Sequence, residues 1–171
     1  MTSLELLNLS SNPLIAPPVD LIDRGVHKLF IYFRLLLKAA RFAKLSLAAY
    51  GLTHFPPDVC VLQHITELTV SGNMLSELCP QFVNMTSLTS LNLSNNRFVV
   101  LPAVACGLTN LRSIDIRMNP LVALTIEAGK LHGYIEEIKL DGITTLQQPP
   151  PGVVQRGTAI ITDRPKSAPS A

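Results

Sequence analysis

The stretch LTSLNLSNNRFVVL, residues 88–101, decides how this chain folds. Apolar residues stand at positions 88, 91, 93, 98 and 101, and an asparagine stands at position 96. The same pattern recurs 23 residues earlier, beginning at Ile65, and 23 residues later, beginning at Leu111. Three consecutive matches at a fixed period indicate structural repeats, each of which buries its apolar side against its neighbours.

Each unit reads as a strand followed by a turn. Leu91 and Leu93 flank one polar residue, which is typical of a short strand with its apolar side chains pointing inward. Asn96 is expected to satisfy backbone groups at the turn out of the strand, which removes a cost of about 1–3 kcal/mol. This L-x-x-L-x-L-x-x-N-x-L pattern is the signature of leucine-rich repeats. The sequence therefore predicts an α/β solenoid, a leucine-rich repeat horseshoe with short parallel strands on its concave face and a spacer helix interrupting the repeats.

The repeat phase divides the chain into four parts. Residues 1–18 read as a first repeat and residues 19–41 as an amphipathic spacer helix. The phase returns for a block over residues 42–148, with units starting near 42, 65, 88, 111 and 135, although Tyr50 stands where the first unit should have its asparagine. Residues 14–25 and 146–157 match each other at an offset of 132, so residues 149–171 read as a partial second spacer that ends in a disordered Pro- and Ser-rich tail.

The spacer segment over residues 19–41 has helical periodicity with a wide apolar arc. We expect this arc to pack against the solenoid as a spacer or cap, because apolar helical faces usually pack internally. The alternative is a basic amphipathic surface for peripheral contact with a membrane or a partner. Arg34, Lys38 and Arg41 are too many charges for a helix that spans a membrane, so no membrane span is predicted.

Composition and motifs exclude several classes of function. Only 15% of the residues are charged and the net charge is +2, which gives no electrostatic basis for nucleic-acid binding. The sequence has no GxxxxGK, HExxH or GxSxG motif, and its four histidines lack the spacing of metal ligands. We therefore expect a protein that is not an enzyme, with no catalytic residues, no cofactor and no metal.

The cysteines and the N-terminal sequence favour a cytoplasmic location. An odd count of three cysteines without a CxxC pair argues against a disulfide framework. The first ten residues contain neither the basic region nor the apolar region of a signal peptide. An extracellular receptor fragment is accordingly disfavoured.

The candidate binding site is the concave face, formed by the polar residues that flank the inward side chains of each strand. No aromatic residue is expected there, so we predict a weak, polar and extended contact with a protein partner. The candidate residues are Lys44, Glu67, Thr69, Ser90, Asn92, Asp115, Arg117, Glu137, Lys139 and Asp141.

The repeats resemble those of intracellular leucine-rich repeat proteins whose 23-residue units read LPxxIxxLxxLxxLxLxxNxL, a group that includes Ras-suppressor-like scaffolds and plant intracellular Ras-group repeat proteins. The resemblance is closest over residues 65–124 and extends with lower fidelity over residues 4–148. It implies a protein–protein interaction module, a scaffold or signalling adaptor, without shared catalytic residues. The alternative is a fragment of a larger leucine-rich repeat enzyme or regulator whose kinase or GTPase domain lies outside this chain.

Overall fold

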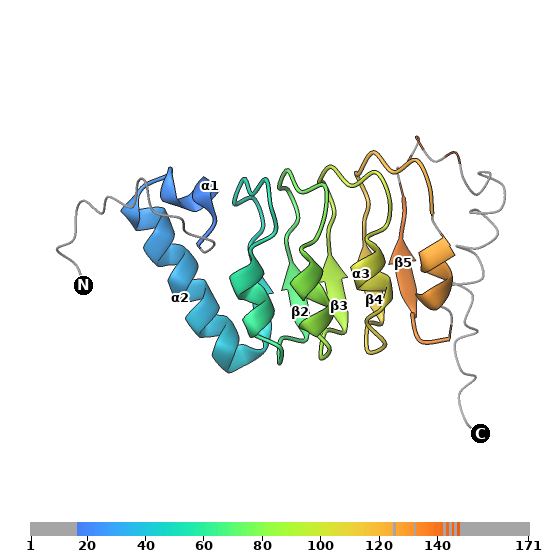
Figure 1. Ribbon diagram of the computed structural model, residues 1–171, viewed down its shortest axis with the longest axis horizontal. Helices are drawn as coiled ribbons and strands as arrows, with labels where there is room; N and C mark the ends of the chain where they lie inside the picture. The colour runs from blue at the N-terminus through green and yellow to red at the C-terminus, as the bar shows by residue number, and fades with distance from the viewer. Residues whose placement is uncertain are drawn as a thin grey trace, which may run out of the picture.

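The computed structural model describes residues 17–124, 126–131 and 133–141, together with residues 143, 145 and 147. Five strands form one parallel sheet in which every strand pairs with its neighbour in the sequence. Successive turns of the chain therefore stack side by side as a solenoid (Figure 1). This confirms the predicted α/β leucine-rich repeat fold. The strands are β1 (Lys44–Ser46), β2 (Glu67–Thr69), β3 (Ser90–Asn92), β4 (Ser113–Asp115) and β5 (Glu137–Lys139).

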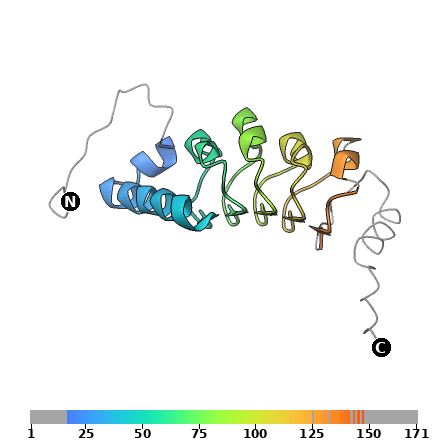
Figure 2. The ribbon, with the colours of Figure 1, turned by 90° about the horizontal axis from the view of Figure 1, so that it is seen from below.

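Short helical turns form a second layer behind the sheet (Figure 2). Proline sets where the first three of these turns begin, because its fixed backbone angle suits the first helical position. Pro57 and Pro80 are the first residues of their turns, and Pro102 directly precedes the third. The four turns are η1 (Pro57–Val61), η2 (Pro80–Asn84), α3 (Ala103–Cys106) and η3 (Ile126–Leu131).

The core lies between the sheet and the turns. Leu68, Leu91 and Ile114 occupy equivalent register positions in neighbouring strands, and each is at most 1% exposed. Leu91 and Leu93 are both buried, as the alternation around Asn92 predicts. Phe82 of η2 closes the core from the other side and meets the ring of Phe55 edge to face. Each repeat is therefore stabilised mainly by its two neighbours.

Three stacked asparagines, Asn73, Asn96 and Asn119, hold the turns that leave the strands. Asn96 is 7% exposed, and its Nδ2 donates to the carbonyls of Val70 and Leu93 at 2.9 and 3.0 Å. Its Oδ1 accepts the backbone N–H of Leu75 at 3.0 Å. Asn73 and Asn119 repeat this arrangement one unit earlier and one unit later. Every asparagine thus ties two successive repeats together through buried backbone groups.

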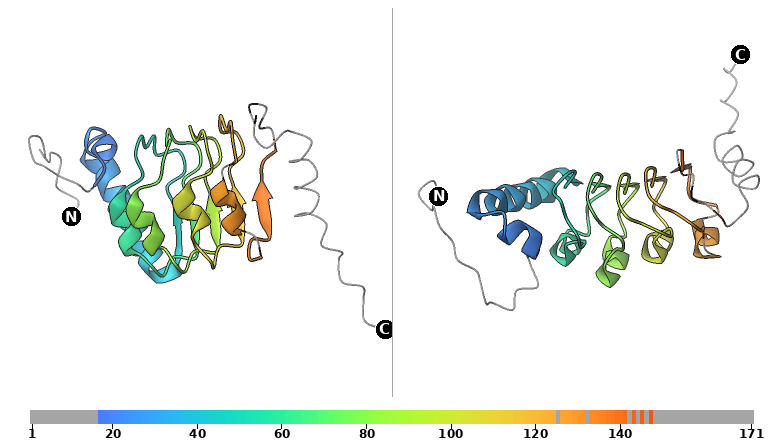
Figure 3. Two further views of the ribbon diagram at one scale, coloured as in Figure 1. Left: turned by 45° about the vertical axis from the view of Figure 1, so that its right-hand side comes forward. Right: turned by 90° about the horizontal axis from the view of Figure 1, so that it is seen from above.

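Two helices close the end of the solenoid that precedes β1 (Figure 3). The two helices are α1 (Val19–Ile22) and α2 (Val26–Phe42). Gly25 directly precedes α2 with a positive φ of 86°, a conformation that glycine adopts readily and that interrupts the helix between the two. The buried face of α2 carries Leu29, Tyr32 and Ala39. The segment predicted as one spacer helix over residues 19–41 is therefore a pair of helices, and both contribute side chains to the buried core cluster.

Parts of the sequence-based description differ from the structure or lie outside it. The unit that the sequence starts near 42 does not begin with an inward side chain, because Phe42 is the last residue of α2 and is 60% exposed. The chain then turns into β1 through Ala43 at a φ of 55°. The first repeat at 1–18, except for residues 17 and 18, and the segment 149–171 lie outside the described residues. The division into domains stays a prediction.

Candidate functional site

The exposed side of the sheet is the candidate binding surface. We call it the open sheet face and define it by the residues on either side of the central apolar residue of each strand. The central residues of the first four strands are buried, so their polar neighbours point away from the core. The open sheet face comprises Lys44, Ser46, Glu67, Thr69, Ser90, Asn92, Ser113, Asp115, Glu137 and Lys139.

Charged side chains at the first end of this face pair across neighbouring strands. Lys44 and Glu67 are register partners in β1 and β2, and Lys44 Nζ lies 2.6 Å from the Glu67 carboxylate. Both side chains are about half exposed or more, so solvent screens the pair and its contribution to stability is small. Such a pair can exchange its internal contact for a contact with a partner at little cost.

Arg117 and Asp115 form the tightest polar contact near the other end. Arg117 Nε and Nη2 donate to the two carboxylate oxygens of Asp115 at 3.0 and 2.8 Å. Partial burial pulls the pKa of Asp115 upward, but the hydrogen bonds from Arg117 and the positive charges of Arg117 and Lys139 outweigh it and hold that pKa below its usual range. Asp115 is only 9% exposed, so Arg117 is the member of this pair that a partner would meet.

The remaining candidates at this end belong to one polar cluster. Glu137 accepts a hydrogen bond from the Ser113 hydroxyl at 3.2 Å and lies 3.4 Å from Lys139 Nζ. Asp141 is exposed just after β5. The structure thus brings Glu137 and Lys139 together with Asp115 and Arg117, on neighbouring strands and their ends.

The middle of the open sheet face is small and uncharged. Asn92 Oδ1 accepts the hydroxyl and the backbone N–H of Ser94 at 2.7 and 2.9 Å. Ser90 and Thr69 lie between the two charged ends at intermediate exposure. A partner polypeptide can therefore approach the backbone of the strands in this middle part, whereas both ends of the open sheet face carry charged side chains.

A cleft that the sequence did not reveal lies where α2 meets the sheet. We call it the end cleft; its volume is about 350 Å³. Three predicted site residues line it, namely Lys44, Glu67 and Thr69. The structure adds an apolar wall and a second cation from α2, because Leu35, Lys38 and Phe42 line the same cleft. Phe42 supplies the exposed aromatic ring that sequence reasoning had not placed on this surface, and the helical phase shared by Lys38 and Phe42 was the one available signal.

A second cleft, of about 360 Å³, contains the arrangement closest to catalytic chemistry. Thr53 Oγ1 lies 2.9 Å from both Asp20 Oδ2 and His54 Nδ1. A nucleophilic hydroxyl needs a histidine as its proton acceptor and a carboxylate behind that histidine. Here the Asp20 carboxylate accepts directly from the hydroxyl and from the Thr53 N–H, so the group anchors α1 to the loop after β1.

Other features of the described chain bear on metals and membranes. No three His, Cys, Asp or Glu side chains in the described ranges gather closely enough to hold a metal ion. Among the helices that the structure describes, none has the length and hydrophobicity needed to cross a bilayer.

Known proteins share this architecture. A family described as "Leucine rich repeat" matches residues 63–121, which include β2, β3 and β4. The fold is a leucine-rich repeat solenoid. The crystal structure of human 5T4 (Wnt-activated inhibitory factor 1, trophoblast glycoprotein) is similar, with 25% identity over 71% of this chain and a TM-score of 0.52. A leucine-rich repeat protein of Leptospira interrogans shows 23% identity over 61% of the chain and a TM-score of 0.45.

These likenesses cover only part of the compared proteins. The chain spans 45% of the 5T4 chain and 33% of the Leptospira chain. No curated protein matches the sequence.

Proposed function

We propose that the chain is a cytoplasmic, non-enzymatic scaffold or signalling adaptor that captures a protein partner on the open sheet face. Leucine-rich repeat domains are in general protein–protein interaction modules. The observation that carries the proposal is the end cleft, in which exposed Phe42 lies beside Lys38 and Lys44. It gives the otherwise polar face one place where an apolar side chain of a partner can be buried.

The charges on this surface favour a polypeptide over a nucleic acid. Lys44 lies beside Glu67 at one end, and Lys139 lies beside Glu137 at the other. A phosphate backbone requires clustered Lys and Arg without interleaved carboxylates. An extended polypeptide with charges of both signs matches this alternation, and its backbone can lie over the small residues Ser90 and Asn92.

Free cysteines support the cytoplasmic part of the proposal. Cys60, Cys79 and Cys106 form no disulfide in the structure, and a fold that is complete without disulfides suits a reducing compartment. Fractionation of cells that express the full chain tests this part, and recovery in the secretory fraction would contradict it.

Site-specific photo-crosslinking tests the binding surface. A photoreactive amino acid at Ser90, in the middle of the open sheet face, should capture proteins that the same amino acid at exposed Gln81 does not, because Gln81 lies in η2 behind the sheet. Combined Arg117→Glu and Lys139→Glu changes should then weaken this capture. Identical proteins at both positions, or capture unaffected by charge reversal, would remove the open sheet face from consideration.

A second candidate rests on the internal match between residues 14–25 and 146–157. A larger protein built from several repeat blocks would show this pattern, with a kinase or GTPase domain outside the present chain. Sequencing of the complete transcript decides between the two candidates. A transcript that encodes such a domain supports the second candidate, and one that encodes these 171 residues alone refutes it.

A further inference from the structure

Helix α2 has a second apolar face that does not touch the repeats. Val26, Phe30, Phe33 and Leu37 follow one another at spacings of four, three and four residues, so they lie along one side of the helix. The face of α2 that packs on the repeats carries Tyr32 and Ala39, which belong to the buried core cluster, and none of the four residues is a member of that cluster. The ring of Phe33 touches only its edge, with its centroid 5.9 Å from that of Tyr32. We call these four residues the outer stripe.

The exposure of the outer stripe increases towards the end of α2. Val26 and Phe30 are half-buried, Phe33 is 37% exposed and Leu37 is 70% exposed. The surfaces of soluble proteins carry scattered apolar side chains, but a row of four along one helix is typical of a surface that contacts a protein partner or a membrane.

Basic side chains border the outer stripe. At 100° per residue, Arg34 and Arg41 lie next to Phe30 and Leu37 on the solvent side of α2. Residues 26–42 contain His27, two lysines and two arginines but no Asp or Glu. Within the described residues, none of these basic side chains forms an ion pair. This side of α2 therefore combines exposed apolar area with uncompensated positive charge.

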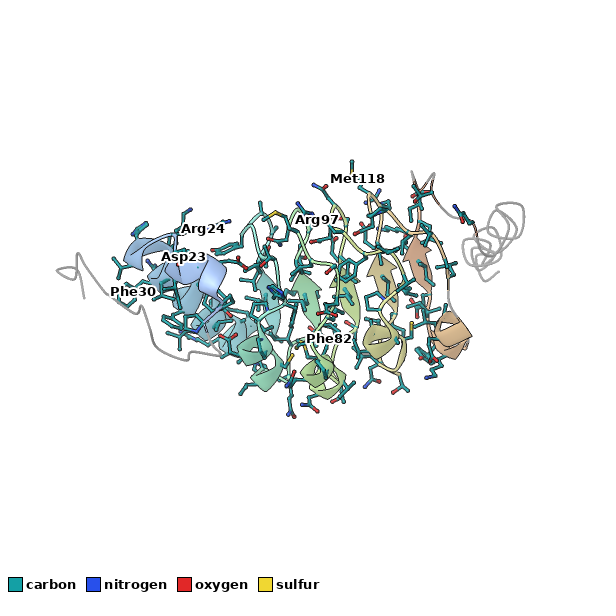
Figure 4. The ribbon with its side chains drawn as sticks, turned by 45° about the horizontal axis from the view of Figure 1, so that its top comes forward. Asp23, Arg24, Phe30, Phe82, Arg97 and Met118 are labelled. Carbon is teal, nitrogen blue, oxygen red and sulfur yellow. The ribbon has the colours of Figure 1, made fainter. Side chains whose placement is uncertain are left out.

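In the part of the chain that the structure describes, α2 is the outermost long element at its end of the solenoid, and the described repeats all lie on one side of it (Figures 1 and 2). Phe30 lies at this outer end, away from the sheet (Figure 4). A flat surface can approach the outer stripe without displacing any of the described repeats.

We propose that the outer stripe of α2 docks the solenoid on an anionic lipid surface. Phe33 and Leu37 enter the boundary between headgroups and acyl chains, while Arg34 and Arg41 contact the anionic headgroups. A second copy of the chain fits this surface less well, because its stripe would bring the same positive charges face to face. The buried face of α2 stays on the repeats, so the helix lies along the lipid surface.

Sedimentation of the full chain with vesicles tests this proposal. The chain should sediment with vesicles of phosphatidylcholine and phosphatidylserine, and much less with phosphatidylcholine alone. Added salt should weaken the binding because it screens the headgroup charges. A wild-type chain that stays in the supernatant with both vesicle types overturns the proposal.

Two variants and a matched control locate the contact. Leu37→Glu and the double change Arg34→Glu with Arg41→Glu should each lower the vesicle-bound fraction about tenfold. Val61→Glu is the control, since Val61 is 78% exposed on η1 behind the sheet, and it should bind as the wild type does. Melting curves verify that all variants fold.

The alternative occupants give distinct results. If Leu37→Glu binds vesicles like the wild type, the outer stripe is not the lipid contact and the proposal fails. If the wild type dimerises in solution and Leu37→Glu makes it monomeric without any vesicle binding, a second copy covers the stripe, which also refutes the lipid proposal. Neither outcome affects the open sheet face, because the crosslinking test above does not use α2.

Discussion

The hydroxyl of Tyr32 donates a 2.9 Å hydrogen bond to Oδ2 of Asp58 and so joins α2 to the first turn behind the sheet. Tyr32 is fully buried, and its pKa lies far above its usual value because of burial and the nearby Asp58 carboxylate. Burial also raises the pKa of Asp58, although Tyr32 and backbone amides offset part of this effect. The contact is therefore a partly buried polar link whose energy depends on the charge of Asp58.

Replacing Tyr32 by Phe should destabilise the fold. The change removes a hydrogen bond to a charged group, so the free energy of unfolding should fall by about 1.5–3 kcal/mol. Urea denaturation of the full chain measures the difference. A loss below about 0.5 kcal/mol would mean that water replaces the tyrosine hydroxyl without cost.

The raised pKa of Asp58 predicts the sign of a pH effect. Because the pKa of Asp58 is higher in the folded protein than in the unfolded chain, the folded protein keeps its proton at pH values where the unfolded chain has released it. The protonated Asp58 therefore contributes stability that is fully present below pH 3.8, the ordinary pKa of the group. That contribution is lost as the pH rises through the folded pKa. Asp58→Asn should therefore gain stability relative to the wild type as the pH rises from 3.8, and parallel melting temperatures across that range would contradict the shift.

The asparagine stack predicts a large effect from one small substitution. Asn96→Ala leaves the carbonyls of Val70 and Leu93 and the N–H of Leu75 without their buried partner, and it should cost about 2–4 kcal/mol. Asn92→Ala is a control on the same repeat, because the side chain of Asn92 is half-buried and among the described residues bonds only to Ser94. Equal losses for the two variants in urea denaturation would show that the stack is not the source of the difference.

A recurring backbone conformation predicts a stabilising change. Ala49, Gly72, Asn95 and Met118 stand 23 residues apart, and each has a φ between 54° and 67°. Met118 is 70% exposed at the row of turns visible in Figure 4. Met118→Gly removes a left-handed strain of about 1–2 kcal/mol and loses part of that gain to unfolded-chain entropy, about 0.4–1 kcal/mol.

The net gain from Met118→Gly should therefore be about 0.5–1 kcal/mol in urea denaturation. The reverse control is Gly72→Ala, for which the nearest atom to the added Cβ would lie 3.7 Å away, so strain rather than a clash should lower its stability. A Met118→Gly variant that is less stable than the wild type would show that the Met118 side chain makes contacts worth more than the strain.

The sequence predicts the repeats well because their physics is local and periodic. Leu91, Leu93 and Asn96 each act within a unit whose copies repeat the same environment. The end cleft depends instead on how α2 crosses β1, and no local pattern encodes that angle. Phe42 shows the difference, since it matches the repeat phase yet ends a helix and faces solvent.

The sequence predicts which polar side chains share one side of the strands, but it does not predict how they pair with one another. Alternation along a strand places Asp115 and Arg117 on one side, as expected. It does not show that Arg117 folds back and covers the Asp115 carboxylate. The ten candidate residues stay a prediction, and the structure shows which of them are already paired with one another.

The three cysteines should differ widely in reactivity. Burial and the nearby Glu127 carboxylate raise the pKa of Cys106 to about 11, and burial together with the adjacent Cys79 raises that of Cys60 further. Since the thiolate is the reactive form, Cys106 should hold about a hundredfold less of it than a thiol of ordinary pKa. Cys79 is half-buried and should be alkylated first, which mass spectrometry of iodoacetamide-treated chain can resolve.

Cys60 and Cys79 should also form a disulfide under mild oxidation, because their Sγ atoms lie 3.6 Å apart between η1 and η2. Peroxide would oxidise the Cys79 thiol to a sulfenic acid, and the Cys60 thiol would displace water from it to form the S–S bond. Cys106 should stay reduced, and Cys79→Ser should abolish the linked peptide. A Cys60–Cys106 link, or no link at all after peroxide treatment, would show that the two turns do not hold the thiols at this separation in solution.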